Sequence, residues 1–146
     1  MFTETQRFRQ PWVWLLLGFV FVMASADFIA EPSLINALSS LGIMSGVTLL
    51  FWIMKLTVET RADALHVRYA PFYSRTIPYS DIEDAYVEPY SLATYWGWGP
   101  RHSSTRGWAY TVSGTKGVRL ELSSGESLYL GSKKPFELVS AIQAKR

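Results

Sequence analysis

Cysteine is absent from this chain of 146 residues. Its absence excludes disulfide bonds, a thiol nucleophile and a thiolate metal site, and it is compatible with a reducing compartment. The two histidines, His66 and His102, lie 36 positions apart, and no third histidine stands near either of them. Because metal sites need several such ligands at short spacing, we expect no bound metal.

The short motifs that hold a nucleophile or a phosphate are also missing: G-x-S-x-G, G-x-x-x-x-G-K, and G-x-G-x-x-G after a strand. Acidic residues are densest at Asp81, Glu83, Asp84 and Glu88. They follow Pro78-Tyr79-Ser80, which predicts a turn with a solvated acidic edge rather than a cation site or an acid/base pair. We therefore expect neither enzymatic activity nor a cofactor. The net charge of +2 also argues against nucleic acid as a partner.

Charge is missing from two long runs near the N-terminus. Seventeen residues separate Arg9 from Asp27, and twenty-three separate Glu31 from Lys55. As helices these runs would cover about 25 Å and about 34 Å, close to a hydrocarbon core of about 30 Å. They predict a transmembrane helical hairpin within residues 1–56, with spans at about 11–30 and 34–56. Residues 57–146 are then expected to form a separate soluble domain.

Two alternatives remain open within this hairpin. The first run has Arg7 and Arg9 before it and the small residues 24–26 near its end, as a cleaved signal peptide would. The second run follows so closely that two spans explain the sequence better. Gly42 and Gly46 form a G-x-x-x-G spacing, which either admits a helix of another chain or seats the first helix against the second.

The flanking charges predict the orientation. Arg7, Arg9, Lys55 and Arg61 lie at one end of the two runs, whereas the connecting loop carries only Asp27 and Glu31. Because Lys and Arg favour the cytoplasmic side, we expect both termini and the 57–146 domain to be cytoplasmic, and the protein to be integral to the cytoplasmic membrane.

From residue 57 the apolar period becomes two, which predicts half-buried antiparallel strands. Apolar side chains alternate at 65–69, 108–112, 118–122 and 128–130, and turn residues separate these segments, giving about seven strands. Pro135 then predicts the start of a C-terminal amphipathic helix. This is an α+β fold, and its order is that of a PH-like (pleckstrin-homology-like) antiparallel β-barrel capped by a helix.

Residues 91–106 do not alternate, and we expect a functional loop there because the segment is long for a plain connection. Its candidate interaction residues are Tyr95, Trp96, Gly97, Trp98, Gly99 and Arg101. Glycines on both sides of Trp98 suggest positive φ or a close backbone approach.

Four segments carry a resemblance to a known family. They are 6–12 (QRFRQPW), 95–101 (YWGWGPR), 112–118 (VSGTKGV) and 130–135 (LGSKKP). With the two spans, they resemble a family of small bacterial membrane proteins that have a PH-like domain and no assigned activity. The resemblance implies this fold and orientation, and it implies no catalytic residue. The chain departs from the family pattern at Trp96, Pro100 and Lys133.

Residues 89–120 contain no acid, and they include a candidate basic patch of Arg101, His102, Arg106, Lys116 and Arg119. Two functions follow from this region. In the first hypothesis, the domain is a protein-interaction module that docks a membrane protein or a second copy of itself through the glycine-aromatic loop. Alternatively, the patch binds anionic lipid headgroups, with Trp at the membrane interface. Single-stranded nucleic acid stacking on the same tryptophans is a distant third.

Overall fold

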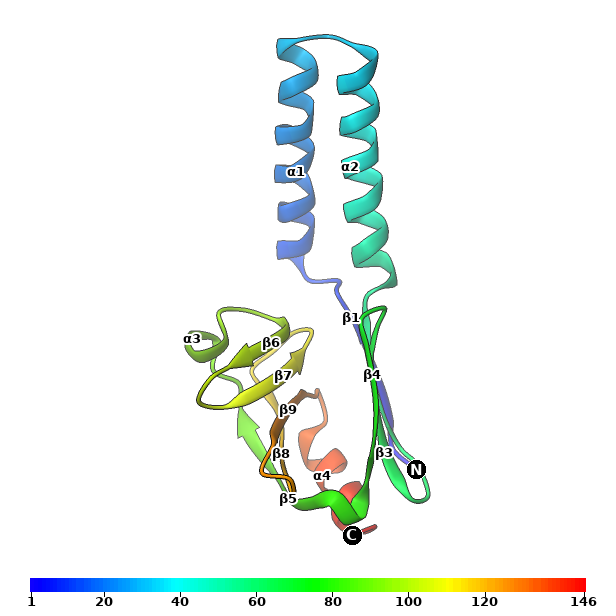
Figure 1. Ribbon diagram of the computed structural model, residues 1–146, viewed down its shortest axis with the longest axis vertical. Helices are drawn as coiled ribbons and strands as arrows, with labels where there is room; N and C mark the ends of the chain where they lie inside the picture. The colour runs from blue at the N-terminus through cyan, green and yellow to red at the C-terminus, as the bar shows by residue number, and fades with distance from the viewer. The chain divides into compact units, whose positions relative to one another are not determined.

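The structure is a computed structural model that describes residues 1–146, and it divides into two compact units. One unit is the helical segment Phe8–Met54. The other combines Met1–Arg7 with Lys55–Arg146 (Figure 1). This division differs from the expected boundary at residue 56, because residues 1–7 belong to the sheet unit, in which Thr3–Arg7 forms a strand.

The helical unit contains α1 (Pro11–Ala30) and α2 (Leu34–Ile53), joined at residues 31–33 as expected. Ser33 caps α2, since its Oγ accepts a hydrogen bond from the backbone N–H of Asn36 at 3.1 Å. The second helix ends three residues earlier than expected because the next strand begins at Lys55. Both helices are long and apolar enough, by length and composition, to cross a membrane.

Polar and aromatic contacts occur within the helical unit. Ser40 Oγ donates a hydrogen bond to the carbonyl oxygen of Ala24 at 2.5 Å, and the rings of Phe8, Trp12 and Phe51 meet edge to face. A methyl group added at Gly42 or Gly46 would meet no other atom within 4 Å. Of the two alternatives for these glycines, the one in which they seat the first helix against the second is therefore wrong.

A four-stranded antiparallel sheet opens the other unit. Its strands are β1 (Thr3–Arg7), β2 (Lys55–Thr60), β3 (Ala64–Ala70) and β4 (Tyr73–Pro78), in that order. Arg7 pairs with Lys55, and Lys55 pairs with Ala70. The strand before the helices is thus bonded directly to the strand after them, so the chain leaves this sheet and returns to it at neighbouring positions.

A 3-10 turn, η1 (Tyr79–Asp81), leads into a second sheet. Its strands are β5 (Ile82–Pro89), β6 (Gly99–Ser103), β7 (Gly107–Thr111), β8 (Lys116–Leu122) and β9 (Ser127–Gly131), in the order β5-β8-β9-β7-β6. Two expectations are corrected here. The part of the chain from Lys55 onward has eight strands rather than about seven, and β1 adds a ninth. Strand β7 pairs with β9 in parallel, so the sheets are not one closed antiparallel barrel.

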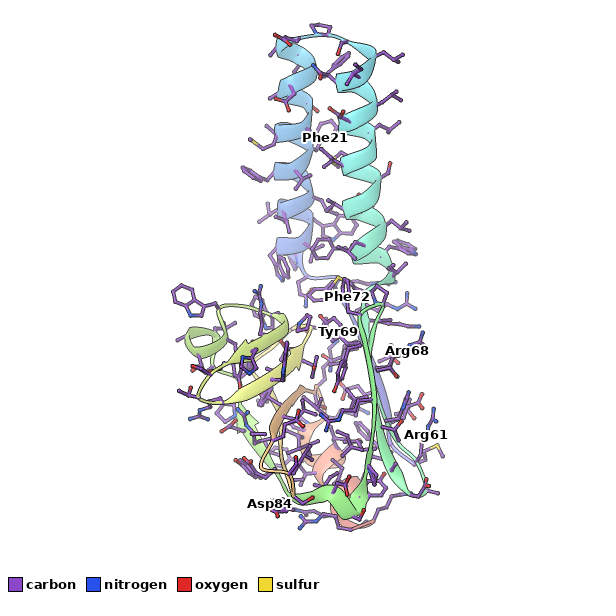
Figure 2. The ribbon with its side chains drawn as sticks, viewed as in Figure 1. Phe21, Arg61, Arg68, Tyr69, Phe72 and Asp84 are labelled. Atoms are coloured by element: carbon purple, nitrogen blue, oxygen red, sulfur yellow. The ribbon has the colours of Figure 1, made fainter.

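The main core lies between the two sheets and includes the C-terminal helix α4 (Pro135–Gln143), which packs against β5 and β8. Pro135 takes the first helical position as expected, and Leu138 and Ile142 are fully buried. Tyr69 spans the core: its hydroxyl donates to the carbonyl oxygen of Thr111 at 3.1 Å (Figure 2). These contacts determine which face of the five-stranded sheet is turned toward the main core.

Candidate functional site

We call residues 91–106 the tryptophan-glycine segment. Its first part is a single helical turn, α3 (Leu92–Tyr95), capped by Ser91, and its second part is the edge strand β6. The expected functional loop therefore contains regular secondary structure. Alternation is absent because an edge strand buries little of either face, and Pro100 is tolerated there because an edge strand has unpaired backbone groups.

The segment covers the second face of the five-stranded sheet and forms a small core there. The buried residues of this core are Tyr90, Tyr95, Ala109 and Tyr129, with Trp98 packed against them. The rings of Tyr90 and Tyr95 are stacked at 5.3 Å with an interplanar angle of 12°. Because Tyr129 lies between the core residues Leu128 and Leu130, its side chain points to the face opposite the main core.

Arg119 lies beneath this segment, and its side chain is only 3% exposed. Its guanidinium forms an ion pair with Glu88, with 2.7 Å between Nη2 and Oε2. Nη1 donates to the carbonyl oxygen of Arg106 at 2.8 Å and to the hydroxyl of Tyr95 at 3.2 Å. The guanidinium also sits 5.2 Å from the ring centroid of Tyr129. We call Glu88, Tyr95, Arg106, Arg119 and Tyr129 the Arg119 cluster.

Burial alone would lower the pKa of Arg119, but hydrogen bonds with Tyr95 and Glu88 outweigh it and raise the pKa above its usual range. Burial raises the pKa of Tyr129 as well. The charge of Arg119 is therefore constant at physiological pH. The cavity beside the cluster has a volume of about 10 Å³, which leaves no room for a ligand. The cluster holds the segment in place against the sheet.

Trp96 lies at the end of α3. In contrast to the buried Arg119, its side chain is 86% exposed. Its φ of 59° is in the left-handed region, which is uncommon for a residue that is not glycine. Leu92, one helical turn earlier, is also exposed, and its carbonyl oxygen accepts the N–H of Trp96 at 2.8 Å. The backbone conformation thus presents a large apolar side chain to solvent.

Three hydrogen bonds hold the residues that follow Trp96. Trp98 Nε1 donates to the carbonyl oxygen of Gly114 at 2.9 Å, the hydroxyl of Tyr90 donates to the carbonyl oxygen of Gly97, and the N–H of Gly99 donates to Thr111 Oγ1 at 3.2 Å. Gly97 and Gly99 have φ values of 120° and 107°. The positive φ expected at these glycines is present, whereas close backbone contact is not.

The expected basic patch does not form one surface. Arg101, His102 and Lys116 are exposed, and the ring of His102 lies 5.0 Å from that of Trp108. Arg106 is paired with Glu88 at 2.8 Å. Arg119 is buried, so its inclusion in a headgroup-facing patch is wrong. The physical reason is that the tryptophan-glycine segment covers the outer face of β8 and encloses the guanidinium.

Sequence reasoning missed Glu88, Tyr90 and Tyr129 as the residues that hold this segment. One signal was present: Arg119 lies between Val118 and Leu120, and Tyr129 lies between Leu128 and Leu130. These two residues are direct partners across β8 and β9. A large aromatic residue opposite a lone arginine indicates that the second face of the sheet is also covered.

No known protein family's sequence profile matches this chain, and no curated protein matches it.

Proposed function

We propose that the chain is an integral protein of a bacterial cytoplasmic membrane, in which α1 and α2 both span the bilayer. Most side chains of the two helices are apolar and exposed, which favours lipid over water as their surroundings. The pairing of Arg7 with Lys55 supports two spans, because it requires the hairpin to leave and return on one side. Cleavage of α1 as a signal peptide would remove β1 from its sheet.

We propose a PH-like fold for the sheet unit. The support is the order of its parts: a four-stranded antiparallel sheet, a second sheet packed on it, and a C-terminal helix in the core. The parallel pairing of β7 and β9 is the main difference from the expected barrel. Basic residues at the helix ends favour a cytoplasmic location for this unit.

The function that the geometry supports best is non-enzymatic docking of a membrane-protein partner through Trp96 and Leu92. The observation that carries it is the exposed Trp96, held in a left-handed conformation on a segment that a buried ion pair fixes in place. Tryptophan anchors often dominate protein interfaces, and a rigid anchor loses little entropy on binding. A partner in the same membrane fits, because only Met54 separates α2 from β2.

Binding of anionic lipid through the same segment is the less favoured function. That hypothesis needs several free cations on one surface, but Arg119 is buried and Arg106 is paired with Glu88. Arg101, His102 and Lys116 remain exposed. The experiment that tests protein docking must therefore also be able to detect binding of lipid by the same segment.

Photo-crosslinking in native membranes tests the proposal. A photoreactive phenylalanine analogue at Leu92 is expected to give a protein adduct of defined mass, and Trp96→Gly in the same chain is expected to abolish it. The same probe at Phe136, which is exposed on α4, is the control and should give no such adduct. An adduct of twice the chain mass would identify a second copy as the partner. Lipid adducts alone, or a protein adduct unaffected by Trp96→Gly, would contradict the proposal.

A further inference from the structure

One end of the four-stranded sheet carries only basic charges. Arg7 ends β1, Lys55 begins β2, and the two are direct partners. Arg68 lies on the same face of the sheet, two residues before the partner of Lys55 on β3. Residues 5–7, 55–57 and 68–74 contain no acid. Arg7, Lys55 and Arg68 form no ion pair, whereas six ion pairs occur elsewhere in the unit.

Phe72 lies at the same end, on the turn between β3 and β4, and its side chain is 60% exposed. The turn is ordered by a 2.9 Å hydrogen bond from the N–H of Phe72 to the carbonyl oxygen of Tyr69. A single exposed aromatic residue is common on protein surfaces. An aromatic ring beside several unpaired cations is the combination that suits a membrane interface, where rings insert at headgroup level and cations bind phosphate.

The covalent connections place this end of the sheet close to the bilayer. Lys55 is two residues beyond the last residue of α2, so it lies within about 7 Å of the end of that helix. The headgroup layer is about 5–8 Å deep on each side of the hydrocarbon core. Neighbouring strands are about 5 Å apart, so the partners of Lys55, Arg7 and Ala70, lie within about 12 Å of the end of that helix. Strand β3 ends at Ala70, the partner of Lys55, so the turn between β3 and β4 lies beyond the first residue of β2.

We propose that Arg7, Lys55, Arg68 and Phe72 form a second membrane-contact site, which we call the basic sheet end. It binds the anionic headgroups of phospholipids, and the Phe72 ring inserts among them. This inference rests on the proposed two-span arrangement, and it is separate from docking at Trp96. Its effect is to keep this end of the sheet unit in contact with the membrane surface.

A position-sensitive probe tests this site in the full chain. Because the sequence has no cysteine, Phe72→Cys can be labelled uniquely with an environment-sensitive nitrobenzoxadiazole dye. The labelled protein is reconstituted into phosphatidylcholine vesicles with or without phosphatidylglycerol, and quenching by lipids with a spin label near the headgroup is measured. Ala62→Cys is the matched control, because it lies in the β2–β3 turn near Arg61, at the opposite end of the same sheet from Phe72 (Figure 2).

The proposal predicts that the probe at residue 72 is quenched and shifted to the blue, whereas the probe at residue 62 behaves as in water. Lys55→Gln and Arg68→Gln should each reduce the ratio of shielded to exposed probe about fivefold in anionic vesicles. Removing phosphatidylglycerol should act in the same direction. Because both replaced side chains lie on the outer face of the sheet, these variants should fold, which circular dichroism checks.

Three results would overturn the inference. If the probe at residue 72 is as exposed as the one at residue 62, while a probe at Leu41→Cys in α2 is shifted to the blue, the hairpin spans the bilayer and the basic sheet end does not touch it. If the probe at Leu41 is not shifted to the blue either, the two-span arrangement is wrong as well. Quenching at residue 72 that is independent of lipid charge and of both glutamine variants would exclude headgroup recognition.

Discussion

Arg119 shows how one residue changes the interpretation of a surface. Its position between Val118 and Leu120 predicts an outward direction, and the side chain does point away from the main core. The tryptophan-glycine segment then covers it, so the guanidinium binds Glu88, Tyr95 and the Arg106 carbonyl instead of solvent. A residue expected to bind lipid instead holds the candidate docking segment against the sheet.

Arg119→Met is expected to lower the free energy of unfolding by about 3 kcal/mol, because it leaves a carboxylate and a tyrosine hydroxyl without their buried partner. The measurement is chemical denaturation of the full chain in detergent micelles. Adding Glu88→Gln should recover part of the loss, since it removes a partly buried carboxylate that has lost one of its two arginine partners. Arg68→Met, at an exposed arginine without an ion pair, is the control. Equal effects at the two arginines would show that the Arg119 cluster does not support the fold.

Trp96→Gly is expected to leave stability unchanged or to raise it by up to about 1.5 kcal/mol. Relief of the left-handed backbone is worth about 1–2 kcal/mol, and the added flexibility of glycine costs about 0.5–1 kcal/mol. Gly97→Val is the contrasting variant: it places a branched side chain at a φ of 120° and should cost more than 1 kcal/mol. Thermal melting measures both. A large loss for Trp96→Gly would mean that the indole stabilises the fold rather than serving a partner.

At the scale of single elements, the success of sequence reasoning depended on how each element is buried. Strands β3, β7, β8 and β9 were predicted from alternation because one of their faces meets the main core. Strand β1 was missed, because Thr3–Arg7 is polar and is held by backbone pairing to a strand 48 residues later. Strand β6 was missed because it is an edge strand in a covering layer. Long-range pairing of this kind leaves no local pattern.

The glycines of α2 provide a prediction about the helical unit. Gly42→Ala and Gly46→Ala should preserve or slightly raise the stability of the hairpin, because the added methyl groups meet no atom and alanine favours helix. Unfolding of the full chain in micelles, followed by helical circular dichroism, measures this. A clear loss of stability together with a loss of self-association would show that a second copy packs on these glycines.

At the scale of the whole molecule, the helical hairpin is an insertion between two adjacent strands of one sheet. The two apolar runs and their turn were predicted from the absence of charge, and the structure contains both helices. Their connection to the sheet unit at two points was not predicted, because it depends on the pairing of β1 with β2. The fold thereby constrains topology: both ends of the hairpin must lie on one side of any membrane it crosses.

Alkaline pH is expected to destabilise the sheet unit. Burial raises the pKa of Tyr69, Tyr110 and Tyr129 above the ordinary value of about 10. The unfolded chain therefore loses these protons at a pH where the folded chain still keeps them. The tyrosine contribution to stability is fully present below about pH 10 and falls as the pH rises further. Denaturation midpoints measured across this range should fall from about pH 10 upward, and constant midpoints up to about pH 12 would disprove this linkage.

The central claim is that a two-span hairpin anchors the sheet unit on the cytoplasmic side of a membrane, and cysteine accessibility tests it most directly. Single cysteines at Thr3, Pro32 and Ala144 are labelled with a membrane-impermeant maleimide in right-side-out and in inverted membrane vesicles. We expect Thr3→Cys and Ala144→Cys to react only in inverted vesicles, and Pro32→Cys only in right-side-out vesicles. Reaction of Pro32→Cys and Ala144→Cys from the same side would contradict the account.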